Sequence, residues 1–475
     1  MYAKDYDPSR NFFEQFRELQ LKVPHMNLVV GYDSLVNSEY VNHAGELKDC
    51  YLIFNTDLCE NVLYSRLVVQ VKDSTDLDAT LESELCYQDI VCFRSYRLFF
   101  SEHCTDCHDV YFSKNLEGCS YCFGCINLRN KKYYIFNKPH TKEDYQQKLK
   151  EFRLDSFQEI EELRRRADAF WLEHPQRCTY GRMNVNSSGE YVFESRNAHF
   201  MYQVKFVEDG KYGQFLTTKP IKDIYDYTEW GSNAQRICDC ITVGLAADNI
   251  RFCYGCWDNV RDLEYCMYVV GGANLFGCVG LRKKQYCILN KQYTKEEFEK
   301  LRARIIRDMT SRPYQDQNGR IYPYGEFFPP ELSFYDANET TIMDYYPLTK
   351  EDARRQGLRW RDPTPPEHTS TIRSEDIPDS ISEVTDAILN EILECSSCKR
   401  AFRLVKAELG LLRRFGFPIP RQCPECRQKG RLHRLNPPRL WDRTCAKCGT
   451  AIKTSYAPER PEIVYCESCY QQEVV

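Results

Sequence analysis

The sequence predicts a mainly β protein made of two related parallel β-helix-like (solenoid) segments, each closed by a helix, with a small cysteine-rich domain after them. Three observations favour this fold class. Short bursts of Tyr, Phe, Val, Ile and Cys alternate with Asn, Asp, Ser and Gly. These bursts recur at a long, regular spacing. Finally, one stretch occurs twice without a gap, as "YCFGCINLRNKKYYIFNKPHTKEDY" from Tyr121 and as "NLFGCVGLRKKQYCILNKQYTKEEF" from Asn274.

The spacing of the bursts points to stacked coils. Tyr40, Tyr64, Cys86, Tyr111 and Tyr134 follow one another at intervals of 22 to 25 residues. A period of this size suits a parallel β-helix, because each coil buries its apolar face only against the next coil. An antiparallel sandwich, in which strands typically recur about every 8–12 residues, is the alternative. The sequence favours the solenoid because tight-hairpin dipeptides are nearly absent.

The chain of 475 residues is long enough for several domains. The boundaries follow shifts in composition and the end of each copy. The predicted parts are an N-terminal helical cap (1–36), a first solenoid repeat with closing helices (37–175), a second repeat with a closing helix (176–310), a Pro-rich connector (311–379) and a cysteine-rich C-terminal domain (380–475).

Helices are predicted at the start of the chain and after each copy of the repeated stretch. "NFFEQFRELQL" places its apolar residues on one side of a helix that ends before Pro24. Thr141 stands three residues before Asp144 and Thr294 three before Glu297, which is the spacing of a capping box. A further helix is predicted from about Ser380 to Leu393.

Composition limits the compartment and class of the protein. The net charge is −5, and neither a secretory leader nor a run of about 18 apolar residues is evident. We therefore expect a cytoplasmic protein without membrane contact. In a reducing compartment the 25 cysteines are expected to be thiols or metal ligands, not disulfides.

The C-terminal region contains four C-x-x-C pairs. They are Cys395/Cys398, Cys423/Cys426, Cys445/Cys448 and Cys466/Cys469. Two such pairs supply the four thiolates of a tetrahedral structural Zn²⁺ site. We expect two zinc sites with the pairs combined in sequence order, and an interleaved combination stays open. This indicates a small zinc-binding domain that needs metal to fold.

The same region is basic, whereas the body of the chain is acidic. The excess lies between residues 413 and 434 in Arg413, Arg414, Arg421, Arg427, Lys429, Arg431 and Arg434. Such a patch could bind a protein partner, dock on the acidic body of this chain, or bind the phosphates of RNA or DNA. A purely solvated face is the remaining interpretation.

A second group of metal-ligating residue types lies in the first copy. It comprises His103, Cys104, Cys107, His108, Cys119, Cys122 and Cys125. A second metal cluster is one interpretation. The other is a row of core thiols, since free cysteine is a common small core residue.

No catalytic motif is evident, so the sequence favours a non-enzymatic role. It contains no G-x-S-x-G, no phosphate loop and no H-E-x-x-H. Carboxylates on stacked coils could hydrolyse polysaccharides, and Asp223, Asp226, Asp239 and Asp262 are candidates for such a row. Solvated corner residues explain them more simply.

Several stretches together resemble an uncharacterised bacterial family of Cys-rich repeat proteins with zinc-binding modules. The matching pieces include "SRNFFEQFRELQLKVP", "NSEYVN", "YGEFFPPELSFYDANET" and both copies of the repeated stretch, and they cover most of the chain. Separately, "CSSCKRAFRLVKAELGLLRRFGFPIPRQCPECR" resembles the treble-clef "probable zinc-binding domain". That resemblance implies zinc at Cys395, Cys398, Cys423 and Cys426, and the family brings no activity with it.

These observations lead to one hypothesis with two alternatives. The first is a zinc-binding, non-enzymatic scaffold that engages a macromolecular partner through its basic C-terminal module. The alternatives are a nucleic-acid-binding protein and a carbohydrate-active β-helix enzyme.

Overall fold

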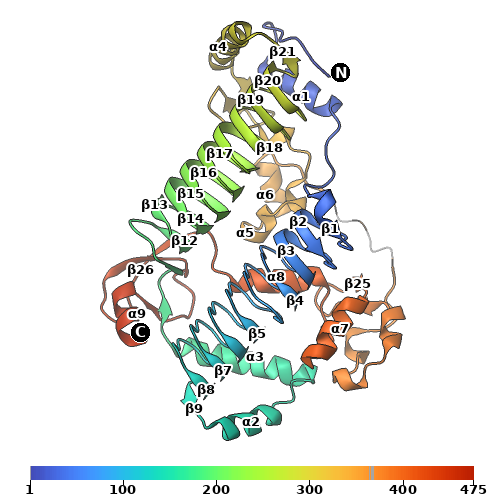
Figure 1. Cartoon of the computed structure of the whole chain (residues 1–475), viewed down its shortest axis with the longest axis vertical. Helices are drawn as coiled ribbons and strands as arrows, with labels where there is room; N and C mark the ends of the chain where they lie inside the picture. Colours follow the sequence, from blue (N-terminus) through green and yellow to red (C-terminus); the bar gives the residue numbers. More distant parts are fainter. Residues whose placement is uncertain (1, 363, 365–367, 475) are drawn as a thin grey trace.

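The computed structural model describes residues 2–362, 364 and 368–474. Four residues of the predicted Pro-rich connector, including Pro363, Pro365 and Pro366, lie outside the described residues. The chain is mostly sheet, with two elongated stacks of parallel strands and helices at their ends and flanks (Figure 1). We call these stacks the first ladder (residues 35–135) and the second ladder (residues 181–288).

The first ladder is built of short layers, and residues twelve positions apart pair between one layer and the next. Its strands are β1 (Leu35–Val36), β2 (Asn42–Lys48), β3 (Phe54–Leu63), β4 (Lys72–Thr75), β5 (Tyr96–Phe99), β6 (His108–Tyr111), β7 (Ser120–Phe123) and β8 (Lys132–Ile135). Parallel pairs join Tyr96 to His108 and His108 to Ser120, and isolated parallel bridges such as Thr75 to Tyr87 continue the stack between β4 and β5. The longer spacing that the sequence predicts for one coil therefore corresponds to about two layers.

The backbone of the first ladder repeats every three residues. Every third residue from Asn37 to Phe136 has a positive φ, including Gly118 and Gly124. The residue after each of these turns inward, so that Val41, Ala44 and Leu47 begin a buried row that continues along the ladder. Ordinary strands alternate with a period of two, and the left-handed residue changes this period to three. Asn and Asp tolerate that conformation better than most residues, which accounts for their frequency at the corners.

The second ladder has the same parallel pairing with longer layers in its middle. Its strands are β11 (Gly181–Arg182), β12 (Gly189–Phe193), β13 (Arg196–His199), β14 (Met201–Lys205), β15 (Val207–Thr218), β16 (Ile221–Gly231), β17 (Ala234–Gly244), β18 (Ala247–Glu264), β19 (Val270–Phe276) and β20 (Arg282–Ile288). Gly189 pairs with Met201, Ile221 with Ala234, and Val270 with Arg282. The layer that starts at Ile221 is thus longer by one position than the layers nearer the two ends.

The repeated stretch ends each ladder in the same way. The Asn137 side chain accepts from the N–H of Ile126 at 3.0 Å and donates to the same residue's carbonyl at 3.0 Å. Asn290 makes the matching pair with Val279 at 2.9 and 2.8 Å. Each asparagine therefore replaces the backbone hydrogen bonds that a further layer would have made, and prevents an open sheet edge.

A short antiparallel strand and a helix follow each of these ends. They are β9 (Lys138–Pro139), α2 (Lys142–Glu151) and α3 (Phe157–Leu172) in the first copy, and β21 (Lys291–Gln292) and α4 (Lys295–Ser311) in the second. The predicted capping box is complete at Thr294 and Glu297. At Thr141 the hydroxyl accepts from the Asp144 N–H, but the Asp144 carboxylate contacts His140 instead of closing the box.

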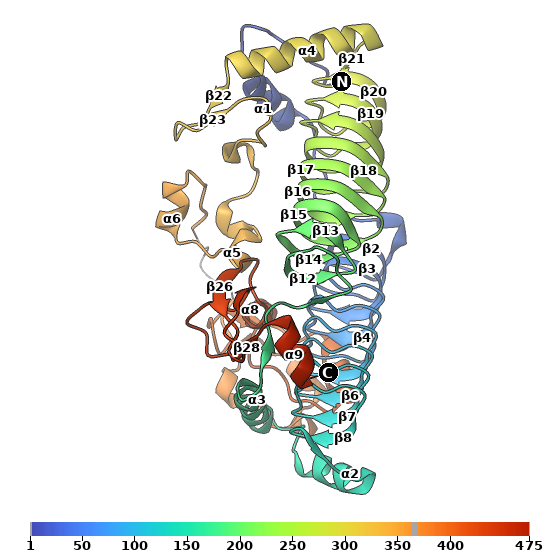
Figure 2. The same cartoon turned by 90° about the vertical axis from the view of Figure 1, so that its left-hand side faces the viewer.

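The two ladders overlap side by side with opposite directions (Figure 2). His43, near the start of the first ladder, lies 3.5 Å from Glu229, and Phe93, farther along it, packs edge-on against Phe193 at 5.5 Å. Residue numbers therefore increase along the first ladder in the direction in which they decrease along the second. The two copies therefore do not stack end to end in one column.

Helix α1 (Phe12–Lys22) forms where the sequence predicts it, but it covers the far end of the second ladder and not the adjacent first one. Phe12 packs against Phe276 at 5.2 Å and against Tyr265 at 5.6 Å. The aromatic side chains of α1 form one buried cluster with residues of α4 and with Phe328 of the connector.

The connector and the C-terminal region contain the remaining short elements. They are β22 (Tyr314–Gln315), β23 (Ile321–Tyr322), α5 (Ile342–Tyr345), α6 (Lys350–Arg355), β24 (Leu393–Glu394), β25 (Ala401–Phe402), α7 (Lys406–Phe415), α8 (Pro424–Arg434), β26 (Trp441–Thr444), β27 (Ala451–Thr454), β28 (Val464–Tyr465) and α9 (Glu467–Val474). The strand β10 (Gln176–Arg177) pairs with β28. No helix within the described residues is long and apolar enough to cross a membrane.

The helix predicted from about Ser380 to Leu393 is wrong. Two separate 3₁₀ turns, Ile381–Glu383 and Asp386–Asn390, occupy the segment. Ser380 caps the first turn and also donates to Asp155, and Thr385 in extended geometry separates the two turns. Packing of the apolar side chains onto the core thus overrides the helical pattern.

Candidate metal centres

The eight C-terminal cysteines form two groups of four. In each group, Cys395/Cys398/Cys423/Cys426 and Cys445/Cys448/Cys466/Cys469, the four sulfurs all lie within 4.8 Å of one another. The pairs combine in sequence order, and the interleaved combination is not the one found. These are the only groups of three or more such ligands in the part of the chain that the structure describes.

Both groups are built from the same two local structures. Cys395 and Cys398 lie in the turn between β24 and β25, and Cys445 and Cys448 in the turn between β26 and β27. The second pair of each group starts a helix, with Cys423 as the N-cap of α8 and Cys466 directly before α9. A helix N-terminus stabilises thiolate charge, so each second pair is well placed to bind a cation through its sulfurs.

The distances within both groups fit a tetrahedral metal. The sulfurs of Cys398 and Cys423 lie 3.8 Å apart, and those of Cys448 and Cys466 are also 3.8 Å apart. A Zn–S bond of about 2.3 Å places the corners of a tetrahedron about 3.8 Å from one another. Four sulfurs at this spacing leave no ligand position open to water, as in structural sites.

Backbone N–H groups make the first sulfur of each group a good ligand. Burial alone would raise the pKa of Cys395, but the N–H groups of Cys398, Cys423 and Ser397 donate to its sulfur and lower the pKa to about 6. Burial opposes the same effect at Cys445, where three N–H groups again lower the pKa to about 6. The thiolate form that a metal needs is therefore favoured at the first sulfur of each group.

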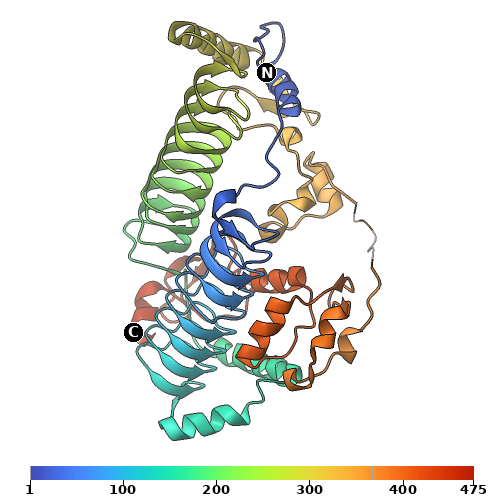
Figure 3. The ribbon, with the colours of Figure 1, turned by 45° about the vertical axis from the view of Figure 1, so that its right-hand side comes forward.

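The predicted basic patch is divided between α7, α8 and the segment that joins them, and α8 lies beside the first ladder (Figure 3). Arg431 of α8 contacts the buried Asp76 of the first ladder at 2.6 Å. Arg427 lies 3.2 Å from the same carboxylate and 2.6 Å from buried Glu408. Arg434 contacts Glu102 and, at 2.6 Å, Asp168 of α3. Three of the seven cations thus pair with buried carboxylates of this chain.

The other four cations of the patch are placed differently. Arg421 is buried and donates to the carbonyls of Ile377 and Pro378 at 2.8 and 2.9 Å. Arg413 and Arg414 are exposed and pair with Asp386 and Asp73. Lys429 is exposed. The patch therefore does not form one continuous cationic surface for nucleic acid, and docking on the acidic body is the arrangement found.

The C-terminal region contacts both ladders. Helix α8 lies against the first ladder through Arg431 and through Gln428, which donates to Asp78 at 2.8 Å. In the loop that follows α8, the N–H of Asn436 donates to Tyr191 of the second ladder at 3.0 Å and its carbonyl accepts from Tyr202 at 2.8 Å. The sequence holds no local signal for these contacts, since Asp76 looks like any other corner aspartate.

The candidate second metal cluster does not assemble in the described residues. Its cysteines, including Cys104, Cys107 and Cys122, point into the core of the first ladder. His103 instead stacks on Tyr180 at 3.9 Å, outside that core, and burial lowers its pKa to about 3. His108 is exposed beside Asp109. The imidazoles and thiols therefore face different surroundings.

The four aspartates considered for a catalytic row do not form one row. Asp226 and Asp239 occupy equivalent positions of neighbouring layers. Burial raises the pKa of Asp239 to about 6, with a further contribution from the charge of Asp226. Asp262 lies in a different column, where it accepts from Asn249 at 2.6 Å.

The comparisons with known proteins add no family. No protein-family model and no curated protein matches the chain. Among solved structures, a "putative acetyltransferase" from Desulfovibrio desulfuricans G20, a crystal structure at 2.28 Å resolution, matches 60% of this chain and 82% of its own. The identity is 11% and the TM-score 0.10, so this likeness carries no argument about fold or activity.

Proposed function

We propose that the chain is a non-enzymatic scaffold in which two structural Zn²⁺ ions hold a C-terminal treble-clef or zinc-ribbon module, and that this module fastens two β-solenoids side by side. The parallel pairing of successive layers in both ladders supports their assignment as solenoids, and the hairpin-plus-helix form of both cysteine groups supports the treble-clef assignment. The division of the chain into the five parts that the sequence predicts also belongs to this proposal.

One observation carries the proposal: the segment between the two cysteine groups contacts both ladders. Arg431 reaches the buried Asp76 of the first ladder, and Asn436, five residues later, bonds to two tyrosines of the second. The first cysteine group ends in α8, just before these contacts, and the second begins shortly after them. Metal at both groups would therefore hold the contact segment at its two ends.

The basic module then acts within the chain. Its buried arginines satisfy buried carboxylates, and an unpaired charge at such a site is strongly destabilising. Of the roles that the sequence left open for the basic patch, we thus propose docking on the acidic body of this chain in place of binding an external partner.

Hydrogen exchange with and without a chelator tests the proposal. Under reducing conditions, removal of metal should raise exchange in α8 and also at residues 180–203, where the second ladder meets the first. Raised exchange confined to residues 393–474, with the contact between the ladders unchanged, would show that the module does not fasten them.

A second candidate function, carbohydrate binding or hydrolysis, is favoured by a cavity of about 290 Å³ between the ladders. Trp230 and Trp257 line it, with ring centroids 6.3 Å apart. Burial, with the charge of Glu46, raises the pKa of Asp57 on its wall to about 6. Glu229 on the same wall accepts from Thr242 at 3.0 Å. Aromatic faces beside two carboxyl groups are a common arrangement for sugars.

Tryptophan fluorescence and reducing-sugar release test this candidate. Cello- and xylo-oligosaccharides should quench the emission, and Asp57→Asn should abolish any sugar release. Oligosaccharides that leave the emission unchanged would remove this candidate and leave the scaffold proposal unaffected.

A further inference from the structure

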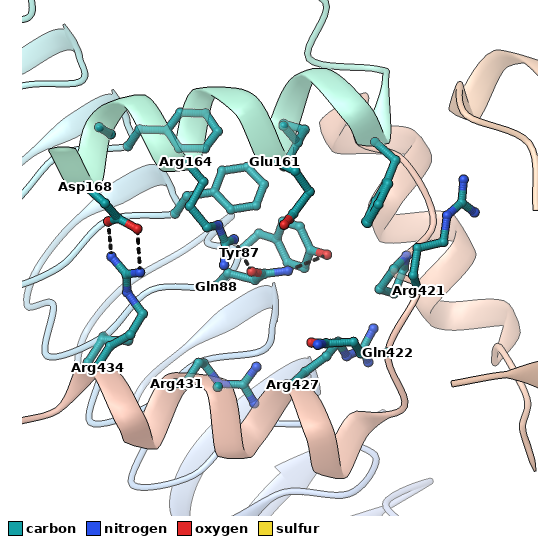
Figure 4. Close-up of a pocket in the computed structure, with 18 of the residues that line it drawn as sticks. Tyr87, Gln88, Glu161, Arg164, Asp168, Arg421, Gln422, Arg427, Arg431 and Arg434 are labelled. Carbon is teal, nitrogen blue, oxygen red and sulfur yellow. Dashed lines mark hydrogen bonds and ion pairs between the residues drawn. The ribbon is translucent and has the colours of Figure 1, made fainter. Parts of the chain in front are cut away.

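A cavity of about 390 Å³ lies between the first ladder, α3 and α8 (Figure 4). Arg164 and Glu161 reach into it from α3, and Arg434 rises from α8 to meet Asp168. The volume is within the range of about 300 to 1,000 Å³ that is usual for small-molecule sites. The lining contains no cysteine among the described residues, but Ser396 and Gln422 are next to Cys395 and Cys423 in the chain, so the cavity adjoins the first cysteine group.

Five arginines line this cavity, and three of them are already paired. They are Arg427, Arg431 and Arg434, whose partners are Asp76, Glu408, Glu102 and Asp168. These carboxylates are in direct contact with the three paired arginines, and Asp168 also attracts Arg164 from farther away.

The other two arginines, Arg164 and Arg421, form no ion pair with any carboxylate within the described residues. Arg164 donates to the side-chain oxygen of Gln88. Arg421 donates only to two backbone carbonyls, and it is 8% exposed. Neither guanidinium is thus in contact with a carboxylate, although Glu161 and Asp168 attract Arg164, and Asp379 attracts Arg421, from farther away.

The unsatisfied polar atoms of the cavity lining are all donors. Nη1 of Arg421, Nη2 of Arg427, Nε of Arg431 and Nε1 of Trp171 are buried without a hydrogen-bond partner. Among the described lining residues, no buried hydrogen-bond acceptor lacks a partner. Buried donors are rarely left unpaired in proteins, so this inventory points to a ligand rich in acceptors.

The two free guanidinium groups are held in fixed orientations. Arg164 lies over the ring of Phe100 at 5.2 Å, and Arg421 over that of Phe157 at 4.8 Å. Burial lowers the pKa of Arg164, and the nearby charge of Arg434 adds to this effect. An anion in contact with Arg164 would therefore relieve both its desolvation and its repulsion by Arg434.

Aromatic side chains form much of the remaining wall. Tyr87, Phe100 and Trp171 line the cavity beside the arginines. Planar rings stack against such a wall, whereas a free inorganic ion would leave it uncovered.

We propose that this cavity binds a small organic phosphate, with the phosphoryl group between Arg164 and Arg421 and a planar ring system against the aromatic wall. Phosphoryl oxygens supply the acceptors that the unpaired donors lack, and arginine is well suited to binding them through two N–H groups. The site uses residues from the first ladder, α3 and the C-terminal module, so the ligand would touch all three.

Calorimetric titration of the full metal-loaded chain tests the proposal, with adenosine monophosphate, adenosine and inorganic phosphate as probes. We expect adenosine monophosphate to bind at least about tenfold more tightly than either of the other two. Its affinity should fall at least about tenfold in Arg164→Gln, and it should weaken as salt is raised. Arg164 makes no ion pair, so this variant is expected to fold.

Arg165→Gln is the matched control, because Arg165 lies next along α3 and is largely exposed beside Glu162. It should bind the nucleotide like the unaltered protein. Arg421→Gln, with its folding checked by thermal unfolding, should lose affinity as Arg164→Gln does.

Several results would overturn the proposal. Equal binding of adenosine and its monophosphate would show that the arginines do not hold a phosphoryl group. Inorganic phosphate binding as tightly as the nucleotide would exclude the role of the aromatic wall. Equal losses in Arg164→Gln and Arg165→Gln, or no binding of any probe, would exclude this cavity as the site.

Discussion

The cysteines of the first ladder and those of the C-terminal region share a spacing but differ in what surrounds them. In the ladder, Cys104/Cys107 and Cys119/Cys122 are C-x-x-C pairs because the inward position recurs every third residue. In the C-terminal region, the same spacing arises from a hairpin turn that directs two sulfurs at one point. The spacing alone therefore does not distinguish a core row from a metal site.

Hydrogen bonding shows what the ladder cysteines do instead. The Cys107 thiol donates to the carbonyl of Thr105, and its N–H donates to the Ser95 hydroxyl at 3.2 Å. Ser95, one layer earlier in the same column, donates in the same way to the carbonyl of Phe93. Cysteine and serine thus occupy one structural role in the core, which is to fill a small space and satisfy a nearby carbonyl.

The largest expected effect is at the metal groups. Cys395→Ser should remove one metal ion and unfold the surroundings of α8, because the folding of such modules depends on binding free energies of about 10 kcal/mol or more. Metal content and hydrogen exchange of α8 measure this. A variant that keeps two metal ions and a protected α8 would contradict the assignment.

The next effect concerns the docked arginines. Arg431→Gln removes a partner of the buried Asp76 and should cost about 3–5 kcal/mol of unfolding free energy. Denaturant unfolding followed at α8 measures it. Arg413→Gln, which breaks the exposed pair with Asp386, is the control and should cost no more than about 1 kcal/mol. Similar costs for the two variants would show that α8 does not dock through Arg431.

The ladder ends should be more sensitive to asparagine loss than the ladder corners. Asn290→Gly keeps the left-handed backbone but leaves the N–H and carbonyl of Val279 unpaired, at a cost of about 1–3 kcal/mol. Asn130→Gly changes an exposed corner asparagine of the same conformation and should be nearly neutral. Exchange rates at residues 279–288 that rise only in the first variant would support the role of Asn290; no rise would refute it.

Stability should also depend on pH through the core of the first ladder. Burial raises the pKa of Asp89 well above its ordinary value, so the folded state keeps a proton that the unfolded state releases above about pH 4. Stability from this group is therefore full below about pH 4 and falls as pH rises toward the folded-state pKa. Asp89→Asn should remove that fall in urea unfolding measured across pH. A variant with the unaltered pH dependence would contradict the assignment.

The smallest effect is expected for the ladder cysteines. Cys107→Ser extends the serine pattern of its own column and should change the unfolding free energy by no more than about 1 kcal/mol. Thermal unfolding measures it. A large loss of stability or of bound metal would show that Cys107 is a metal ligand, as the C-terminal cysteines are.

Local patterns predicted the parts of the fold that depend on neighbouring residues. The parallel stacking, the two copies with closing helices, and the four C-x-x-C pairs all follow from residue types at fixed spacings. The short layer of the first ladder was missed, although its signal is present: the cysteines of this ladder all fall on the same phase of a three-residue repeat. Expecting strands to alternate with a period of two hid that repeat.

Contacts between segments far apart in the chain could not be predicted from the sequence. Nothing near Asp76 or Tyr191 indicates that α8 and Asn436 meet them. For the same reason, the sequence left open whether the basic residues dock on the acidic body of this chain or bind an external partner, and Arg164 did not stand out from the other charges of α3. The segment from Ser380 to Leu393 has a helical apolar pattern, but its packing decides its backbone.

The metal content of the protein, purified under reducing conditions without chelator, tests the central distinction between the two kinds of cysteine most directly. The account predicts two zinc ions per chain, one after Cys445→Ser, and still two after Cys107→Ser. A metal content near zero in the unaltered protein, or one that falls in Cys107→Ser as it does in Cys445→Ser, would contradict it.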